Sequence, residues 1–271
     1  MKRKIRIAIA LWFYVFAVLP AKLRTRVRPS LTVLYYHAVP DSYAENFERQ
    51  MRSLAQYTHA MAADLSNAEL QPKTLNRPLV AVTFDDAFES VLDNAIPILG
   101  KYNIPCTIFV PTACMGGPPN WEMETTADAT ERVAAPERLR NLPANIVAIG
   151  SHSVRHPHLS RLPATQVTRE LEDSKLLLGS LLEREITTLA FPYGDYNSGV
   201  VTLCKDAGYK YVFTIEPEPI EIGRNDFVRG RVKADPSDGR LEFYLKCQGC
   251  YAWVSRLTRF VRRSLGRHDR D

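Results

Sequence analysis

The chain has 271 residues, of which 45% are hydrophobic, 24% are charged and 10% are aromatic. This balance is ordinary for a globular protein and excludes a disordered or collagen-like chain. A chain of this length can bury a sizeable core in one large α/β domain or in two small ones. Five cysteines are too few, and odd in number, for a disulfide scaffold.

The net charge of +5 is unevenly distributed along the chain. Residues 1–30 carry eight lysines and arginines with no acid, and residues 251–271 carry six arginines against two aspartates. The 220 residues between them therefore carry a net charge of −7. An acidic body argues against nucleic-acid binding, which requires a basic working face. The two basic ends are instead suited to anionic lipid headgroups.

An uncharged run of 15 residues, 7–21, reads IAIALWFYVFAVLPA. It is shorter than the roughly 20 residues that cross a bilayer. It could be a signal-peptide core, a signal anchor or a helix lying in the membrane interface. The absence of a small-x-small site and the basic residues that follow argue against a cleaved signal. We predict that residues 1–30 attach the protein to a membrane of the cell envelope. Four basic residues lie on each side of the run, so the charges do not indicate on which side of the membrane the protein lies.

The C-terminal residues 251–271 are predicted to form a basic amphipathic tail. Its apolar residues recur at helical spacing and its arginines fill the other positions. Such a helix either binds a membrane surface or packs on the body with its cations in water. The apolar positions are Trp253, Val254, Leu257, Phe260, Val261 and Leu265.

Between these ends, short β-rich runs alternate with longer helical ones. This alternation predicts a parallel sheet or a (β/α) barrel in one domain, residues 31–250. Residues 114–145 interrupt this alternation of strands and helices. Their sequence predicts an insertion loop followed by one helix. Gly208 stands where a glycine would cap the last helix. The predicted strands are 31–36, 79–84, 107–110, 146–149, 189–191 and 211–215, and the predicted helices are 47–57, 88–102, 164–183 and 199–207.

Two adjacent carboxylates, Asp85 and Asp86, close the strand predicted at residues 79–84. The carboxyl ends of barrel strands are where such folds hold their active sites. Because side chains alternate along an extended chain, the two carboxylates must aim differently, which fits a metal ligand beside a base. A turn or a helix cap is the simpler explanation of the pair taken by itself.

Two histidines, His152 and His156, follow the strand predicted at residues 146–149. In a helical turn this spacing places both rings on one face, suitable for one divalent metal. Two histidines and one aspartate leave coordination positions open, the pattern of a catalytic metal site. A third segment, Phe191 to Asp195, could hold the Tyr193 N–H toward an oxyanion, or could be an ordinary strand-to-helix turn.

Together these segments resemble the polysaccharide deacetylase family, the NodB-homology deacetylases of carbohydrate esterase family 4. Its first motif, T-F-D-D, matches Thr83 to Asp86, and its second, H-[ST]-x-x-H-P, matches His152 to Pro157. A proline–tyrosine motif matches Pro192-Tyr193-Gly194. The resemblance covers about residues 31–232 and implies a distorted (β/α) barrel.

The resemblance also implies roles for these residues. Asp85 is expected to be the general base, and Asp86, His152 and His156 the ligands of a divalent metal, Zn²⁺ first and Co²⁺, Ni²⁺ or Mn²⁺ as alternatives. The Tyr193 N–H is expected to share the oxyanion with the metal. The implied reaction is removal of N-acetyl groups from amino sugars of a bacterial-type polysaccharide.

This sequence departs from the family pattern at several places. Ala87 replaces the glycine after T-F-D-D, and Phe191 replaces the arginine that orients the base, so the partner of Asp85 stays open. The late Leu-x-His motif is missing, which leaves Asp85 itself, or less favourably His37, to protonate the product. An impaired glycan-binding protein, or a deacetylase of a lipid-linked sugar, therefore remains as an alternative.

Two further features have simpler structural explanations. The C-x-x-C spacing of Cys247 and Cys250 has no second pair, so a zinc or redox role is disfavoured. Trp121 could stack on a sugar ring, although such a residue more often anchors its own loop.

Overall fold

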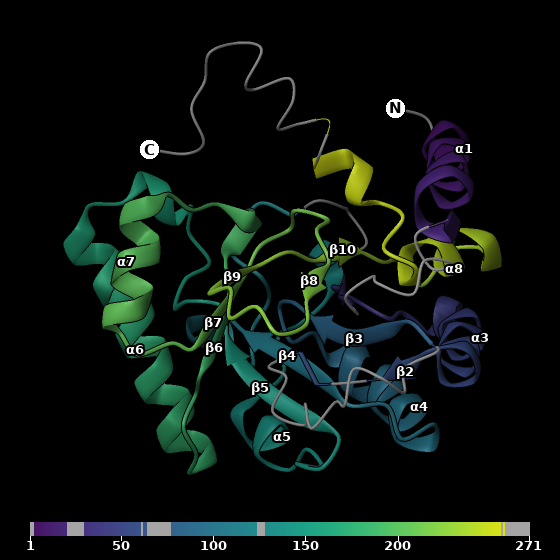
Figure 1. The fold of residues 1–271 in the computed structure, drawn as a ribbon. Helices are drawn as coiled ribbons and strands as arrows, with labels where there is room; N and C mark the ends of the chain where they lie inside the picture. The colour runs from purple at the N-terminus through teal and green to yellow at the C-terminus, as the bar shows by residue number, and fades with distance from the viewer. Residues whose placement is uncertain are drawn as a thin grey trace.

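The computed structural model describes residues 3–20, 30–60, 62–63, 77–123, 128–255 and 257. A ten-stranded sheet forms its centre, with the main path β10-β1-β3-β4-β5-β6-β7-β9 and all neighbours on that path parallel (Figure 1). β2 pairs with β3, and β8 runs antiparallel to β1. The strands are β1 (Ser30–Tyr36), β2 (His59–Ala60), β3 (Leu79–Phe84), β4 (Cys106–Val110), β5 (Val147–Ser151), β6 (Thr188–Ala190), β7 (Tyr211–Phe213), β8 (Ile220–Glu221), β9 (Val228–Arg229) and β10 (Val232–Lys233).

The two ends of this path are joined by the chain itself. β9 and β10 lie at opposite ends of the strand order, yet only Gly230 and Arg231 separate them in sequence. The segment from β9 to β10 therefore bridges the gap in the sheet. A Cβ atom at Gly230 would lie 2.5 Å from the carbonyl oxygen of Glu216, so glycine permits this close approach. The sheet is a nearly closed barrel, as predicted.

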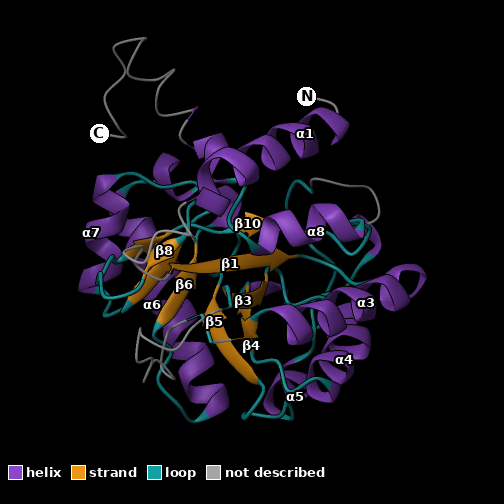
Figure 2. Cartoon of the chain, turned by 45° about the vertical axis from the view of Figure 1, so that its right-hand side comes forward, coloured by secondary structure: helices purple, strands orange, loops and turns teal. Residues whose placement is uncertain are grey.

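Helices surround the barrel on its outside (Figure 2). The strands β3 and β4 are buried along their whole length, as parallel strands covered on both faces are expected to be. The helical elements are α1 (Arg3–Phe13), η1 (Tyr14–Val18), α3 (Asp41–Tyr57), η3 (Val91–Ala95), α4 (Ile96–Lys101), η4 (Thr112–Cys114), η5 (Asp128–Thr130), α5 (Pro136–Arg140), η6 (Leu159–Arg161), α6 (Ala164–Leu182), η7 (Pro192–Gly194), α7 (Ser198–Asp206) and α8 (Arg240–Cys247).

Most of the predicted elements are present with shifted ends. The first predicted helix begins six residues earlier, at Asp41, whose acid favours a helix N-terminus. The helix predicted at 88–102 contains the π-helical turn η3. The single helix expected after the insertion loop is α5, and Gly208 follows α7 with a φ of +77°. The strand predicted at 211–215 ends at Phe213.

The predicted terminal segments are described only in part. α1 lies against α8, and among the described residues no helix has the length and apolar character to cross a membrane. Residues 252–255 are helical, whereas residue 256 and residues 258–271 of the predicted tail lie outside the described residues.

Candidate active site

Three buried side chains, Asp86, His152 and His156, meet at the carboxyl end of the barrel strands. The Asp86 Oδ1 atom lies 3.7 Å from His152 Nε2 and 3.6 Å from His156 Nε2. The three ligand atoms all lie within 4.8 Å of one another. Atoms bound about 2.0–2.1 Å from one tetrahedral ion lie roughly 3.4 Å apart, so this spacing fits a single divalent metal.

The turn after β3 separates the two carboxylates. The Asp85 N–H donates to the Tyr36 carbonyl oxygen at 2.9 Å, which continues the pairing of β3 with β1. Asp86 and Ala87 then adopt φ values of +68° and +52°. This left-handed turn directs Asp86 toward the histidines, while Asp85 points to a different partner. The adjacent carboxylates aim differently, as predicted, but through this turn and not through the alternation of an extended strand.

The histidines are not on a helical turn, and that expectation was wrong. Ser153 and His156 have φ values of +65° and +58°, which an α-helix does not allow. The loop is instead held by Glu170 of α6, whose Oε2 atom accepts hydrogen bonds from the N–H groups of Val154 and Arg155, both at 2.8 Å. The two imidazole centroids lie 4.7 Å apart.

The surroundings of both histidines keep them neutral, which is the form that binds a metal. Burial lowers the pKa of His152 to about 4 and that of His156 to about 2. His152 Nδ1 lies 2.8 Å from the Ala190 carbonyl oxygen, to which it donates in the neutral ring. This contact leaves Nε2 unprotonated toward Asp86, the usual arrangement of a metal-binding histidine.

Asp85 forms a two-pronged ion pair with Arg231, the residue that closes the barrel between β9 and β10. One guanidinium nitrogen lies 2.6 Å from Oδ1 and the other 2.8 Å from Oδ2. Arg231 is fully buried, and its Nε donates to the Thr214 carbonyl oxygen at 3.1 Å. Burial by itself would raise the pKa of Asp85, but the Arg231 charge and hydrogen bonds outweigh it and lower that pKa to about 2.

Sequence reasoning missed Arg231. It identified the loss of the family arginine at Phe191 and left the partner of Asp85 open. Arg231 lies 146 residues from Asp85 and belongs to no motif that the sequence analysis recognised. Only the closure of the barrel brings the two together.

One cavity contains all five predicted site residues. Its empty volume is about 450 Å³, counting the open space at its mouth. The cavity is lined by Asp85, Asp86, His152, His156 and Tyr193, together with Tyr35, His37, Trp121, Glu122, Met123, Asp128, Phe191 and Ile215.

Aromatic rings pack around His156. The Trp121 ring stacks on the imidazole with centroids 4.5 Å apart, and the Tyr193 ring meets it edge-on at 4.6 Å. Trp121 thus anchors its loop to a predicted metal ligand while it also lines the cavity. Tyr193 has a φ of +56° within η7.

The cysteines of the C-x-x-C segment belong to the core. Cys247 and Cys250 are buried cysteines of the main hydrophobic cluster that form no disulfide, and burial raises the pKa of Cys247. A protonated thiol is a poor ligand and a poor nucleophile. Their place in the core agrees with the disfavoured zinc or redox role.

The site lies at the carboxyl end of a (β/α) barrel and combines an ionised carboxylate with three side chains whose spacing fits a divalent metal. This combination is typical of hydrolases. The family model for polysaccharide deacetylase matches residues 72–212. The chain belongs to the polysaccharide deacetylase family and is an enzyme of that family.

Individual relatives agree with this assignment. The chain is 25% identical over 223 residues to YxkH of Bacillus subtilis, which covers 80% of this chain and 75% of that protein. It is 27% identical over 175 residues to the poly-beta-1,6-N-acetyl-D-glucosamine N-deacetylase of Staphylococcus aureus, which covers 62% of this chain and 57% of that protein.

Solved structures confirm the fold. The deacetylase PplD of Streptococcus pyogenes, solved in complex with acetate, superimposes with a TM-score of 0.67 at 19% identity, covering 82% of this chain and 99% of that one. IcaB from Ammonifex degensii gives a TM-score of 0.66 at 23% identity, covering 83% and 98%.

Proposed function

We propose that this enzyme removes N-acetyl groups from amino sugars of a bacterial-type polysaccharide, with a β-1,6-linked N-acetylglucosamine polymer as the first substrate to test. The observation that carries the proposal is the buried Asp86–His152–His156 set in one cavity with an ionised Asp85. The name of the Staphylococcus aureus relative supports the choice of glycan.

Asp86, His152 and His156 would hold a divalent cation, which would acidify a water molecule and polarise the amide carbonyl. Zn²⁺ suits two imidazoles and one carboxylate, and Co²⁺, Ni²⁺ and Mn²⁺ are compatible with the same donors. The neutral state of both histidines supports this assignment, because only the unprotonated nitrogen binds a metal.

Side chains of the chain itself would accept and donate the protons in this reaction, and one backbone N–H would donate a hydrogen bond. Asp85 acts as the general base, and Arg231 keeps its carboxylate ionised and fixed in orientation. The Tyr193 N–H, placed by its left-handed backbone, would donate to the developing oxyanion. The leaving amine would receive its proton from Asp85 or from His37, which lines the same cavity.

Two observations count against the alternative of an impaired glycan-binding protein. That alternative rests on the lost arginine at Phe191 and on the missing late histidine. Arg231 provides an arginine partner for Asp85 from another part of the chain, and His37 provides a histidine in the cavity. A lipid-linked sugar as substrate keeps the same chemistry and differs only in what the acetylated sugar is attached to.

The test is acetate release by the full-length protein from β-1,6-linked and β-1,4-linked N-acetylglucosamine oligomers. The assay is run as purified, after chelation, and after Zn²⁺, Co²⁺, Ni²⁺ or Mn²⁺ is restored. We expect release that chelation abolishes and metal restores, with a loss of about 10²–10⁴-fold in Asp85→Asn. Tight metal binding without release from either oligomer would move the proposal to the lipid-linked substrate. If neither metal binding nor release were found, the proposal would be rejected.

A further inference from the structure

The N-terminal helix is packed on the barrel through one of its faces. Ala10 of α1 is fully buried in the main core, and Ile7, Phe13, Tyr14 and Val18 pack against that core. The Tyr14 hydroxyl lies 3.0 Å from the Tyr244 hydroxyl of α8. The segment that the sequence presents as a hydrophobic run therefore has one side covered by the enzyme itself.

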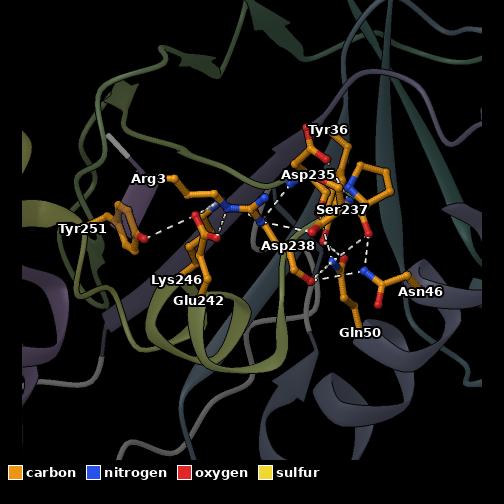
Figure 3. A network of polar contacts seen from close by, with 11 residues as sticks. Arg3, Tyr36, Asn46, Gln50, Asp235, Ser237, Asp238, Glu242, Lys246 and Tyr251 are labelled. Atoms are coloured by element: carbon orange, nitrogen blue, oxygen red, sulfur yellow. Dashed lines mark hydrogen bonds and ion pairs between the residues drawn. The ribbon is translucent and has the colours of Figure 1, made fainter. Parts of the chain in front are cut away.

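A buried polar cluster receives the first turn of α1 (Figure 3). Lys246 Nζ lies 2.6 Å from Asp238 Oδ2 and 3.6 Å from Glu242 Oε1, and the side chains of all three are at most 8% exposed. Two carboxylates and one ammonium leave one negative charge uncompensated at this place. A further cation beside these carboxylates therefore stabilises the cluster.

Arg3 supplies that cation. Its Nε donates to Glu242 Oε2 at 2.6 Å, and one terminal nitrogen donates to Asp238 Oδ1 at 3.2 Å. The pKa of Arg3 is raised, first of all by the hydrogen bond to Glu242. Arg3, Ala10 and Tyr14 are seven and four residues apart, which places them on one face of the helix. These contacts fix which face is turned outward.

The opposite face carries large apolar side chains that nothing in the described part of the chain covers. Trp12 is 62% exposed and Phe16 is 65% exposed. We call this surface the outer face of the N-terminal helix. It consists of Ile5, Leu11, Trp12, Val15, Phe16 and Leu19. An apolar row of this kind on a soluble domain marks a contact with a partner.

We propose that the outer face lies in the surface layer of an anionic lipid bilayer, with the helix parallel to the membrane and its inner face held on the barrel. Charge identifies this partner. Four basic residues precede the apolar run, four follow it, and residues 1–30 contain no acid. Aromatic side chains such as Trp12 and Phe16 suit the depth of the headgroups, and flanking lysines and arginines attract anionic lipids.

The same charges argue against a second copy of the chain as the partner. Pairing two outer faces would bring together two segments that each carry seven cations besides Arg3, and residues 1–30 contain no acid. A bilayer that contains phosphatidylglycerol supplies the opposite charge and the apolar layer at once.

The position of Arg3 connects this surface with the catalytic cavity. Asp235 and Asp238 lie two and five residues after β10. β10 is parallel to β1 and β1 to β3, so β10 ends at the same end of the barrel as β3 and Asp85. The first turn of α1 is thus attached at the catalytic end. A membrane bound to the outer face would place the cavity close to glycan at the membrane surface.

The test is sedimentation of the full-length protein with phosphatidylcholine vesicles that either contain or lack phosphatidylglycerol. We expect binding that requires the anionic lipid and weakens with salt. The double variant Trp12→Ser/Phe16→Ser should bind at least about tenfold more weakly. The matched control is Leu176→Ser/Leu177→Ser on α6, whose side chains are 74% and 47% exposed but lie in an acidic body, and it should bind like the unchanged protein. Equal binding by the Trp12/Phe16 variant, or no binding at all, would overturn the proposal.

Tryptophan fluorescence provides a second readout that does not depend on a disruptive variant. Vesicles should shift the emission to shorter wavelength, and Trp12→Phe should remove most of this shift while Trp253→Phe retains it. A shift that persists in Trp12→Phe contradicts the proposal. So does a lipid-free dimer that Trp12→Ser/Phe16→Ser separates, since a second copy would then occupy the outer face.

Discussion

Two arginine–carboxylate networks of similar geometry serve two different purposes in this molecule. Arg231 meets Asp85 inside the barrel, and Arg3 meets Asp238 and Glu242 between α1 and α8, each with a shortest contact of 2.6 Å. Arg231 is completely buried, whereas the side chain of Arg3 is 52% exposed. The inner pair leaves a carboxylate facing the catalytic cavity. The outer cluster neutralises its charges and attaches a helix.

The two arginines differ in how far their side chains are buried from solvent. A fully buried ion pair is costly to break because the remaining partner stays unpaired in a medium of low dielectric constant. A half-exposed arginine is screened by solvent, and its loss is partly compensated by water. We therefore expect substitutions in the inner network to affect both stability and activity, and those in the outer cluster to affect mainly the position of α1.

The largest effect is expected at the proposed metal ligands, which line the same cavity as Asp85 of the inner pair. His152→Ala and His156→Ala each remove one of three ligands, so the bound metal and acetate release should both fall to background. Elemental analysis and the acetate assay measure the two outcomes. His59→Ala, on an exposed position of β2, is the matched control and should retain both. One tightly bound metal per chain in His156→Ala would contradict the assigned triad.

Breaking the inner pair should cost both stability and rate. Arg231→Met leaves Asp85 buried without its cation, and we expect a loss of about 3–5 kcal/mol in unfolding free energy. Arg231→Lys keeps the charge but loses the two-pronged contact, so kcat should fall about 10–100-fold with a smaller change in KM.

The control for this prediction is Arg229→Lys. Arg229 is also buried in the closing segment, but its guanidinium lies 3.3 Å from the Tyr211 ring centroid and donates to the Ala63 carbonyl oxygen, away from the cavity. Its kcat should stay within about twofold of the unchanged enzyme. If Arg229→Lys and Arg231→Lys lowered kcat alike, the two-pronged contact would have no special role.

The parts of the site that the sequence revealed are those formed by neighbours in the chain. Asp85 and Asp86 are adjacent, His152 and His156 are four residues apart, and each segment follows a strand that periodicity identifies. Strand order then brings the segments together, because parallel strands place their carboxyl ends at one end of a barrel. The fold class, and the five residues that the structure brings together in one cavity, could therefore be predicted without coordinates.

The parts that the sequence did not reveal depend on distant partners. Arg231 lies 146 residues from Asp85, and Arg3 lies 239 residues from Glu242. β9 and β10 have two residues each, too few for any periodicity. The helical geometry expected at His152 was wrong because the Glu170 carboxylate of α6 binds the loop N–H groups, an interaction that local spacing does not contain.

Breaking the outer cluster should have a smaller effect on stability. Arg3→Met should lower the unfolding free energy by about 1 kcal/mol, since solvent screens the half-exposed guanidinium. Urea unfolding at low and high salt measures this loss, which should shrink as salt rises. Arg6→Met on the same helix is the control, with an expected change of less than about 0.5 kcal/mol. A loss in Arg3→Met as large as that in Arg231→Met would remove the distinction between the networks.

The smallest effect is expected at Ala87, beside the inner network. Its φ of +52° costs an alanine about 1–2 kcal/mol, which Ala87→Gly would relieve. Glycine gains about 0.4–1 kcal/mol of conformational freedom in the unfolded chain, and removal of the fully buried methyl group costs about 0.8 kcal/mol more. These contributions nearly cancel, so urea unfolding should show a change within about 0.5 kcal/mol and acetate release should stay within about twofold. A stabilisation above about 1 kcal/mol would instead show that the turn carrying Asp85 and Asp86 stores more strain than this balance assigns to it.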